Sequence, residues 1–267
     1  MLKEKNNKLS IIVPAYMQEQ TIVSDTKNII LVLNQLNYLY EVVIVVDGKS
    51  DKTYENVKKA KLSRVKVFGY KKNHGKGYAI RYGMARCNGD IVGFIDAGAD
   101  LNPMGLRMLL AHFEWYQADI IIGNKWHPVS KVDFPFWRKF ISKAYGFYVK
   151  LLFGLRVEDT QLGMKLFKRS VLEKVMPRLL VKKFAMDVEI LAVAHKLGFT
   201  RIYEAPIELE WHGEESRLEK QLFRTMWNMF LDTLAVFYRL KILHYYDDGS
   251  KRKWRFDKDL EMRINVG

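Results

Sequence analysis

Apolar runs and amphipathic segments alternate along the first half of the chain. Nearly continuous apolar stretches, typical of buried strands, occupy residues 10–15, 41–46, 64–70, 90–95 and 119–123. Segments with helical spacing of apolar residues separate them, at 21–37, 52–61, 78–87 and 103–115. Strands that are apolar on both faces and alternate with helices predict a parallel sheet covered by helices on both sides. We therefore expect residues 1–125 to form one doubly wound, Rossmann-like, nucleotide-binding half of an α/β fold.

The pattern changes after residue 125. Residues 134–154 mix aromatic and basic side chains with helical spacing, which suits either packing against the sheet or binding at a membrane interface. A helix is expected at 187–197, a strand at 201–211, and a second aromatic-rich amphipathic helix at 222–243. We divide the chain into a main domain (1–221, with its second half at 126–221), a membrane-associated amphipathic helix (222–246) and a polar tail (247–267).

Composition narrows the choice of partners. The chain of 267 residues has a formal net charge of +14, which favours nucleic acid, an anionic membrane surface or phosphorylated substrates. Its basic residues are interleaved with apolar helical faces rather than gathered in one stripe, and this argues against nucleic acid. The single cysteine, Cys87, excludes an intramolecular disulfide. Neither a signal peptide nor a sufficiently long apolar span is visible, so we expect a cytoplasmic protein without a membrane-spanning helix.

Polar side chains follow three of the predicted strands. Pro14, Ala15 and Tyr16 with Glu19 follow the first, Asp47 follows the second, and Asp96 with Asp100 follows a later one. Because the carboxyl ends of parallel strands meet at one edge, we expect these groups to converge. One acid there suits a nucleobase or ribose, and another suits a divalent cation bound across a diphosphate. The structural alternative is that these acids close turns or cap helices, and for Asp51 we favour the cap.

A glycine-rich segment, Asn-His-Gly-Lys-Gly at 73–77, precedes one of the predicted helices. Glycine at 75 and 77 lets backbone N–H groups approach an anion such as a diphosphate. Short glycine loops are also common as plain turns, and the segment alone leaves both interpretations open.

Taken in order, several motifs resemble the inverting glycosyltransferases of family 2 with a GT-A fold, and among them the polyprenyl-phosphate (dolichol-phosphate) hexosyltransferases. They lie at 12–16 with Glu19, 73–77, 89–90, 96–97, 159–167 and 187–189. The block at 159–167 resembles the dolichol-phosphate glucosyltransferase branch. The resemblance implies a mostly parallel sheet flanked by helices. It also implies transfer of a hexose from a nucleotide-diphosphate sugar, of the UDP-glucose or GDP-mannose type, to polyprenyl phosphate. The cofactor would be Mg²⁺ or Mn²⁺, and the enzyme would be peripheral on the inner face of the membrane.

The resemblance also implies roles for individual residues. The nucleotide sugar would contact Pro14, Ala15, Tyr16, Glu19, Asp47, Lys76, Asp96 and Ala97. The metal would be held by Asp96 and Asp100, and the acceptor phosphate by Lys125, Arg138, Ser142 and Arg217. Catalysis would involve Asp159, Gln161 and Asp187.

Two departures from the family pattern affect the donor site. Val46 replaces the first of two acids at the second strand end, which leaves Asp47 alone to contact the nucleobase or ribose. Gly98 replaces the second metal acid, and the carboxylate of Asp100 is displaced by two residues. Either Asp100 loops back to the metal, which we favour, or Asp96 and the diphosphate hold the ion with water.

Two other functions remain open from the sequence. An acceptor phosphate is already anionic and needs positioning more than a strong base. If the acceptor were instead a sugar hydroxyl in glycan or cell-wall assembly, Asp187 would be the general base. A binding module that has lost turnover is the other alternative, suggested by Val46 and Gly98.

Overall fold

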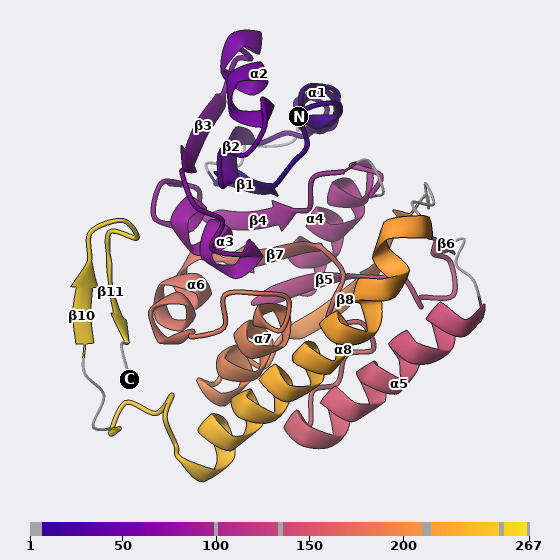
Figure 1. The fold of residues 1–267 in the computed structure, drawn as a ribbon, viewed down its shortest axis with the longest axis vertical. Coiled ribbons are helices and arrows are strands. Elements are labelled where there is room, and N and C mark those ends of the chain that lie inside the picture. Colours follow the sequence, from indigo (N-terminus) through magenta and orange to yellow (C-terminus); the bar gives the residue numbers. More distant parts are fainter. Residues whose placement is uncertain (1–6, 99–100, 133–135, 210–214, 251–253, 266–267) are drawn as a thin grey trace.

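A seven-stranded sheet forms the centre of the molecule in a computed structural model that describes residues 7–98, 101–132, 136–209, 215–250 and 254–265. The strands are β1 (Lys8–Ala15), β2 (Leu39–Asp47), β3 (Val65–Tyr70), β4 (Ile91–Ile95), β5 (Ile120–Asn124), β7 (Met164–Lys168) and β8 (Ile202–Pro206), in the order β3-β2-β1-β4-β7-β5-β8 (Figure 1). Every pair is parallel except those of β7, which runs antiparallel to both β4 and β5. The expected mostly parallel sheet is confirmed.

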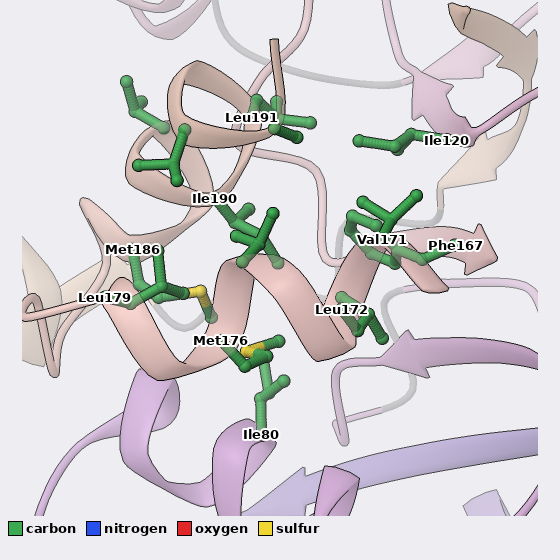
Figure 2. Packing of buried hydrophobic residues seen from close by; sticks show 14 of the residues in the cluster. Ile80, Ile120, Phe167, Val171, Leu172, Met176, Leu179, Met186, Ile190 and Leu191 are labelled. Atoms are coloured by element: carbon green, nitrogen blue, oxygen red, sulfur yellow. The ribbon is translucent and has the colours of Figure 1, made fainter. Parts of the chain in front are cut away.

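Helices cover both faces of the sheet. One face packs against α1 (Ile22–Asn34), α2 (Thr53–Ala60) and α4 (Gly105–Trp115). The other packs against α3 (Lys76–Met84), α6 (Arg169–Val175) and α7 (Met186–Lys196). Figure 2 shows this second layer, where Ile80 of α3 lies near Leu172 and Met176 and where α7 contributes Ile190. Burial of this apolar surface on both sides is the main stabilising contribution to the fold.

Two long helices lie side by side outside the second layer (Figure 1). They are α5 (Phe136–Phe153) and α8 (Glu215–Phe237), and a π-helical segment, η2 (Tyr238–Ile242), continues α8. The Tyr145 and Thr233 hydroxyls are 2.7 Å apart, and the Tyr148 ring stacks on Phe230 at 4.7 Å. The described part of the segment at 134–154, helix α5, therefore packs against the body of the protein, with Val149 and Phe153 in its core, although Phe140 and Phe147 stay exposed. Among the described helices, none combines the length and apolarity needed to cross a bilayer.

The second half differs from the sequence-based expectation in three places. The block at 159–167, for which the sequence predicts no regular element, leads into β7, and β7 completes the sheet between β4 and β5. Helix α6 and the short 3₁₀ helix η1 (Met176–Arg178) follow it. The expected strand at 201–211 is split at Pro206 into β8 and β9 (Glu208–Leu209), and β9 pairs with β6 (Lys131–Val132) instead of the main sheet. Proline explains the break because it cannot donate a ladder hydrogen bond. The helix expected from 222 begins at Glu215.

The tail is also more structured than its polarity indicates. Residues 254–265 contain an antiparallel hairpin of β10 (Trp254–Asp257) and β11 (Met262–Asn265). Just after η2, Tyr246 is completely buried, and its hydroxyl donates a 2.6 Å hydrogen bond to Glu189 of α7. Leu260 in the tail and Tyr246 just before it are buried, and Met262 packs against the core, so apolar contacts hold this largely polar segment in place.

Candidate active site

A cleft opens at the carboxyl ends of β1, β2 and β4, with a volume of about 480 Å³. It is lined by the strand-end residues Pro14, Ala15, Tyr16, Gln18, Asp47, Asp96 and Ala97, by Asn73, Gly75 and Lys76, by Lys183 and Phe184, and by Thr225, Asn228, Met229 and Asp232 of α8. Seven of the eight side chains that the sequence assigns to the nucleotide sugar thus face one cavity. Parallel strands bring them together because their carboxyl ends share one edge of the sheet.

Glu19 is the exception. Its carboxylate accepts a 3.0 Å hydrogen bond from the Lys52 backbone N–H, and Asp51 accepts one of the same length from the N–H of Thr53. Both acids therefore organise the start of α2, as N-terminal caps do. The expected capping role of Asp51 is confirmed, whereas Glu19 lies outside the residues that line the cleft.

The glycine-rich loop is held in place by hydrogen bonds to other parts of the protein. The Asp47 carboxylate accepts hydrogen bonds from the backbone N–H groups of His74 (2.7 Å) and Gly75 (2.9 Å). The N–H of Gly77 donates to the Lys182 carbonyl at 2.9 Å. Gly75 has φ +97°, and a Cβ there would lie 2.5 Å from the same carbonyl oxygen, so only glycine fits. These three N–H groups bind protein acceptors rather than an anion, and Asp47 anchors the loop while it lines the cleft.

A series of alternating charges begins at Asp96 on the floor of the cleft. The Lys76 ammonium lies 3.0 Å from Asp96 Oδ2 and 3.1 Å from Asp187 Oδ2. Lys165, which is fully buried, lies 2.7 Å from the other oxygen of Asp187. Burial favours the neutral form of Lys76, but the charges of Asp187 and Asp96 outweigh it and raise its pKa. Burial lowers the pKa of Lys165, and the charge of Asp187 opposes that shift.

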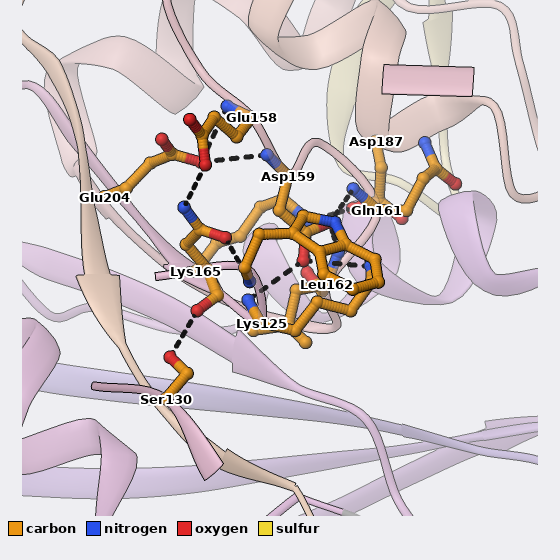
Figure 3. A network of polar contacts seen from close by, with 11 residues as sticks. Lys125, Ser130, Glu158, Asp159, Gln161, Leu162, Lys165, Asp187 and Glu204 are labelled. Carbon is orange, nitrogen blue, oxygen red and sulfur yellow. Dashed lines mark hydrogen bonds and ion pairs between the residues drawn. The ribbon is translucent and has the colours of Figure 1, made fainter. Parts of the chain in front are cut away.

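The series continues from Lys165 to the loop at 158–162 and to Lys125, which lie outside the residues that line the cleft (Figure 3). The Lys165 ammonium donates to the Leu162 carbonyl, and the Leu162 N–H donates to Asp159 Oδ1 at 3.2 Å. Lys125 then places its ammonium 2.9 Å from each oxygen of Asp159. Asp96, expected at the donor, and Lys125, expected at the acceptor, are thus joined through two ammonium groups, two carboxylates and the backbone of Leu162. The structure also pairs Lys125 with Asp159, which the sequence assigned to separate roles.

Beneath this pair, Glu204 of β8 supports the loop that carries Asp159. One oxygen of Glu204 accepts hydrogen bonds from the backbone N–H groups of Glu158 and Asp159, each 2.9 Å long. Burial, with smaller contributions from the neighbouring carboxylates, raises the pKa of Glu204 to about 7. The loop is therefore held by a carboxyl group that changes charge near neutral pH.

Comparison with known proteins identifies the family. The sequence profile of glycosyl transferase family 2 matches residues 10–176. The chain belongs to this family. It is 34% identical over 205 residues to a dolichyl-phosphate beta-glucosyltransferase of Drosophila melanogaster, covering 71% of this chain and 63% of that protein. It is 32% identical over 221 residues to the dolichyl-phosphate beta-glucosyltransferase of Dictyostelium discoideum, covering 76% and 66%. The chain thus matches less than two thirds of the length of these two relatives.

Solved structures share the fold of this family 2 glycosyltransferase. Glucosyl-3-phosphoglycerate synthase of Mycobacterium tuberculosis aligns with a TM-score of 0.65 at 17% identity, covering 97% of this chain and 86% of the other. Mannosyl-3-phosphoglycerate synthase of Rubrobacter xylanophilus aligns with a TM-score of 0.67 at 14% identity and the same coverage. The expected GT-A fold is confirmed.

Several buried polar atoms of the glycosyltransferase have no protein partner among the described residues. They are Asp96 Oδ1, Trp126 Nε1, Thr160 Oγ1 and Gln161 Nε2 along the charged series and beside it. Buried polar groups are normally hydrogen-bonded, so the unpartnered oxygen of Asp96, which lines the cleft, indicates a place for a ligand there. Trp126 also has two cations near its ring, Lys125 at 5.3 Å and Lys143 at 5.5 Å.

The remaining expected acceptor and metal residues are only partly described. Ser142 is half-buried on α5. Arg138 lies on α5 and Arg217 on α8, but both side chains fall outside the described part of the structure, as does Asp100. Their proposed contacts with phosphate and metal stay predictions.

Three functional features escaped the sequence reasoning. Lys165 was visible as a lysine within an apolar strand, a signal for a buried ion pair. Gly163 is required because a Cβ there would lie 1.9 Å from Asp96 Oδ2. The contribution of α8 to the cleft was not predicted either, although Thr225, Asn228 and Asp232 interrupt its apolar residues at helical spacing.

Proposed function

We propose that this family 2 glycosyltransferase transfers a hexose, with inversion, from a nucleotide-diphosphate sugar to polyprenyl phosphate at a membrane surface. Two relatives at 34% and 32% identity are dolichyl-phosphate beta-glucosyltransferases, which supports a polyprenyl-phosphate acceptor and a UDP-glucose type of donor. The M. tuberculosis enzyme of the same fold was solved with UDP-glucose and Mn²⁺.

The contacts of Asp187 favour one of the two possible acceptors. Its side chain is 2% exposed, and each of its oxygens is occupied by the ammonium group of a different lysine, Lys165 or Lys76. A general base must lie within hydrogen-bonding reach of the proton that it removes. Asp187 is also not among the residues that line the cleft, so its carboxylate does not face the space in which a sugar hydroxyl would bind. A phosphate oxygen needs no deprotonation, so this arrangement favours polyprenyl phosphate over the alternative acceptor, a sugar hydroxyl.

In the proposed reaction, an oxygen of the lipid phosphate attacks C1 of the donor hexose. The new C1–O bond forms as the bond from C1 to the diphosphate oxygen breaks, and that bond's electron pair leaves with the nucleoside diphosphate. No proton changes place. Lys125 and the unpartnered donors Trp126 Nε1 and Gln161 Nε2 would orient the attacking phosphate or the sugar, and positioning of this kind supplies much of the rate.

A divalent cation fits the donor end of the cleft. Asp96 Oδ1 is buried and unpartnered, as expected of a carboxylate oxygen that awaits a ligand. The described residues contain no group of three or more His, Cys, Asp or Glu side chains that could hold a metal, so diphosphate oxygens and Asp100 would complete the shell. Mg²⁺ sites in proteins commonly combine one or two carboxylates with substrate phosphates. The bound ion would neutralise charge on the diphosphate leaving group.

The paired helices α5 and α8 provide a surface for the membrane. Large apolar side chains are exposed on both, among them Phe147 (69%) and Leu151 (72%) of α5 and Trp227 (63%) of α8. Apolar surface of this extent beside lysines such as Lys143 and Lys150 suits an anionic leaflet. We propose peripheral binding through this surface, on the inner, cytoplasmic face of the membrane.

Incubation with short polyprenyl phosphate and a panel of nucleotide sugars tests the proposal. Mass spectrometry of the lipid fraction should show a gain of one hexose for one donor class, dependent on Mg²⁺ or Mn²⁺ and abolished by chelation. NMR of the product should show that the anomeric configuration is opposite to that of the donor. Nucleotide binding without transfer or hydrolysis of any donor would instead support a binding module.

A further inference from the structure

The loop before α7 brings a lysine to the donor cleft. Lys183 lines the cleft together with Gly75 and Asp96. A Cβ at Gly75 would lie 3.5 Å from Cγ of Lys183, so the aliphatic stem of this lysine lies against the glycine-rich loop. The preceding residue, Lys182, is tied to the same loop, because its carbonyl accepts the 2.9 Å hydrogen bond from the Gly77 N–H. Lys183 therefore stands beside the glycine-rich loop, within the cavity that Asp96 also faces.

A buried carboxylate holds this loop in place from the other side. Glu189 of α7 is fully buried, and its carboxylate accepts hydrogen bonds from the backbone N–H groups of Leu180 (3.1 Å) and Val181 (2.9 Å). The Tyr246 hydroxyl donates a further one at 2.6 Å. The backbone that carries Lys183 is thus fixed, whereas the Lys183 side chain is exposed to the cleft.

The ammonium group of Lys183 is left unpaired by the protein. Of the described residues that line the cleft, Lys76 and Lys183 are the two that carry a positive charge. Lys76 already lies within 3.1 Å of two carboxylates, Asp96 and Asp187. Lys183 forms no ion pair or side-chain hydrogen bond with any described residue. It is therefore the cation of the described cleft lining that is available to a ligand.

The charges around Lys183 are positive in sum even with the nearby acid included. A second cavity, of about 470 Å³, shares Lys183 and Asp232 with the cleft and adds Lys182 and Arg239. Asp232 is the single acid among the described residues that line this cavity. Arg239 is engaged elsewhere, since its Nε donates a 3.0 Å hydrogen bond to the Tyr246 hydroxyl. Lys182 and Lys183 still outnumber Asp232, so this side of the cleft attracts anions.

We propose that Lys183 binds the diphosphate of the donor. The proposal rests on the proposed function and adds a residue to its donor site. A diphosphate in the cleft would be repelled by the carboxylates of Asp47, Asp96 and Asp232 unless cations lie between them. A divalent ion would offset part of this repulsion, and the Lys183 ammonium is a second cation in the same cavity. Lysine is a common phosphate ligand that acts as a point charge, and positive charge on the leaving diphosphate favours its departure from C1.

Lys183→Gln tests the proposal, with Lys182→Gln as the matched control. The control removes the same charge from the adjacent residue, which lines the second cavity but not the cleft. Both side chains are exposed, so both variants should fold normally. Calorimetry with Mn²⁺ would measure the affinities for UDP, GDP and the corresponding monophosphates, UMP and GMP. Lys183→Gln should bind the diphosphate that the wild type prefers about tenfold or more weakly, because a hydrogen bond between charged groups is lost.

The monophosphates and the control variant decide between a diphosphate contact and a general effect. Lys183→Gln should weaken binding of the monophosphate by about threefold at most, and Lys182→Gln should stay within twofold of wild type for every nucleotide. Equal losses for the mono- and diphosphate, equal effects of the two variants, or diphosphate affinity of Lys183→Gln within twofold of wild type would overturn the proposal. A wild type that binds UDP or GDP but transfers no hexose to polyprenyl phosphate would refute the proposed function alone, and the binding comparison would still decide the role of Lys183.

Discussion

Replacing Gly163 by alanine is expected to disable Asp96 without unfolding the protein. A Cβ at position 163 would lie 1.9 Å from Asp96 Oδ2 and 2.3 Å from its Cγ. Gly163 is not among the glycines with positive φ, so alanine causes no backbone strain there. The three nearest atoms all belong to the Asp96 side chain, from its Cβ at 2.9 Å to the carboxylate that we propose as the metal and diphosphate ligand.

The size of the effect follows from how far Asp96 must move. Cβ contacts below 3.0 Å are not found in proteins, so the carboxylate has to retreat by roughly 1 Å or more, and displacements of that size at a reacting centre cost about 100-fold in rate. The Asp96 side chain is 39% exposed and has the cleft to move into. The free energy of unfolding should therefore fall by no more than about 1–3 kcal/mol, the usual cost of overpacking.

The assay compares kcat/KM for hexose transfer with urea unfolding. Gly249→Ala is the control, because a Cβ at Gly249 meets nothing within 4 Å. We expect Gly163→Ala to lose about 100-fold in kcat/KM and to require more Mn²⁺ for half-maximal rate, while the control resembles wild type. A folded Gly163→Ala variant with activity within twofold of wild type would refute the assigned role of Asp96.

Three further variants test other parts of the structure. Glu204→Gln keeps the acceptor oxygen but cannot ionise. Because the folded-state pKa of Glu204 is raised to about 7, the free energy of unfolding of the wild type should decline as pH rises from about 4.5 to 7. In urea titrations, the variant should be more stable than the wild type at pH 8, by on the order of 1 kcal/mol after solvent screening. The two proteins should be equally stable near pH 4. Tyr246→Phe should lower the free energy of unfolding by about 1–3 kcal/mol by removing the buried bond to Glu189, and unchanged stability would show that this bond does not stabilise the fold. Phe147→Ser should weaken binding to anionic vesicles about tenfold in a sedimentation assay, because it removes exposed apolar surface. The control Trp115→Ser on α4 should leave vesicle binding unchanged. Equal effects of the two variants would contradict the proposed role of α5 in membrane binding.

The convergence of the strand-end residues on one cavity could be predicted from the sequence because its geometry is local to each strand end. Asp47 and Asp96 each follow a buried apolar strand, and parallel topology alone brings them to one edge. The same reasoning could not place β7, whose pairing with β4 and β5 depends on contacts distant in sequence. With β7 unplaced, the burial of Lys165 between Asp187 and the Leu162 carbonyl was not foreseen.

The other omissions have equally physical causes. Burial and loop contacts determine the protonation of Glu204, and its place in the sequence shows neither. The polar residues of α8 that line the cleft, Asp232 among them, stand between large apolar residues, and the sequence does not show which cavity they face. The glycine loop was ambiguous because glycine permits both an anion site and a tight turn, and only the contacts of Gly75 and Gly77 with the protein distinguish the two.

Hexose transfer to polyprenyl phosphate and to the corresponding unphosphorylated polyprenol, measured with one enzyme preparation and one donor, tests the central claim most directly. Since the buried Asp187 carboxylate is paired with two lysines, we propose that it does not deprotonate the acceptor. We therefore expect transfer to the phosphate and at most a trace, lower by about 1,000-fold or more, to the alcohol. Comparable rates on the two lipids, or transfer to a sugar hydroxyl with none to the phosphate, would contradict the account.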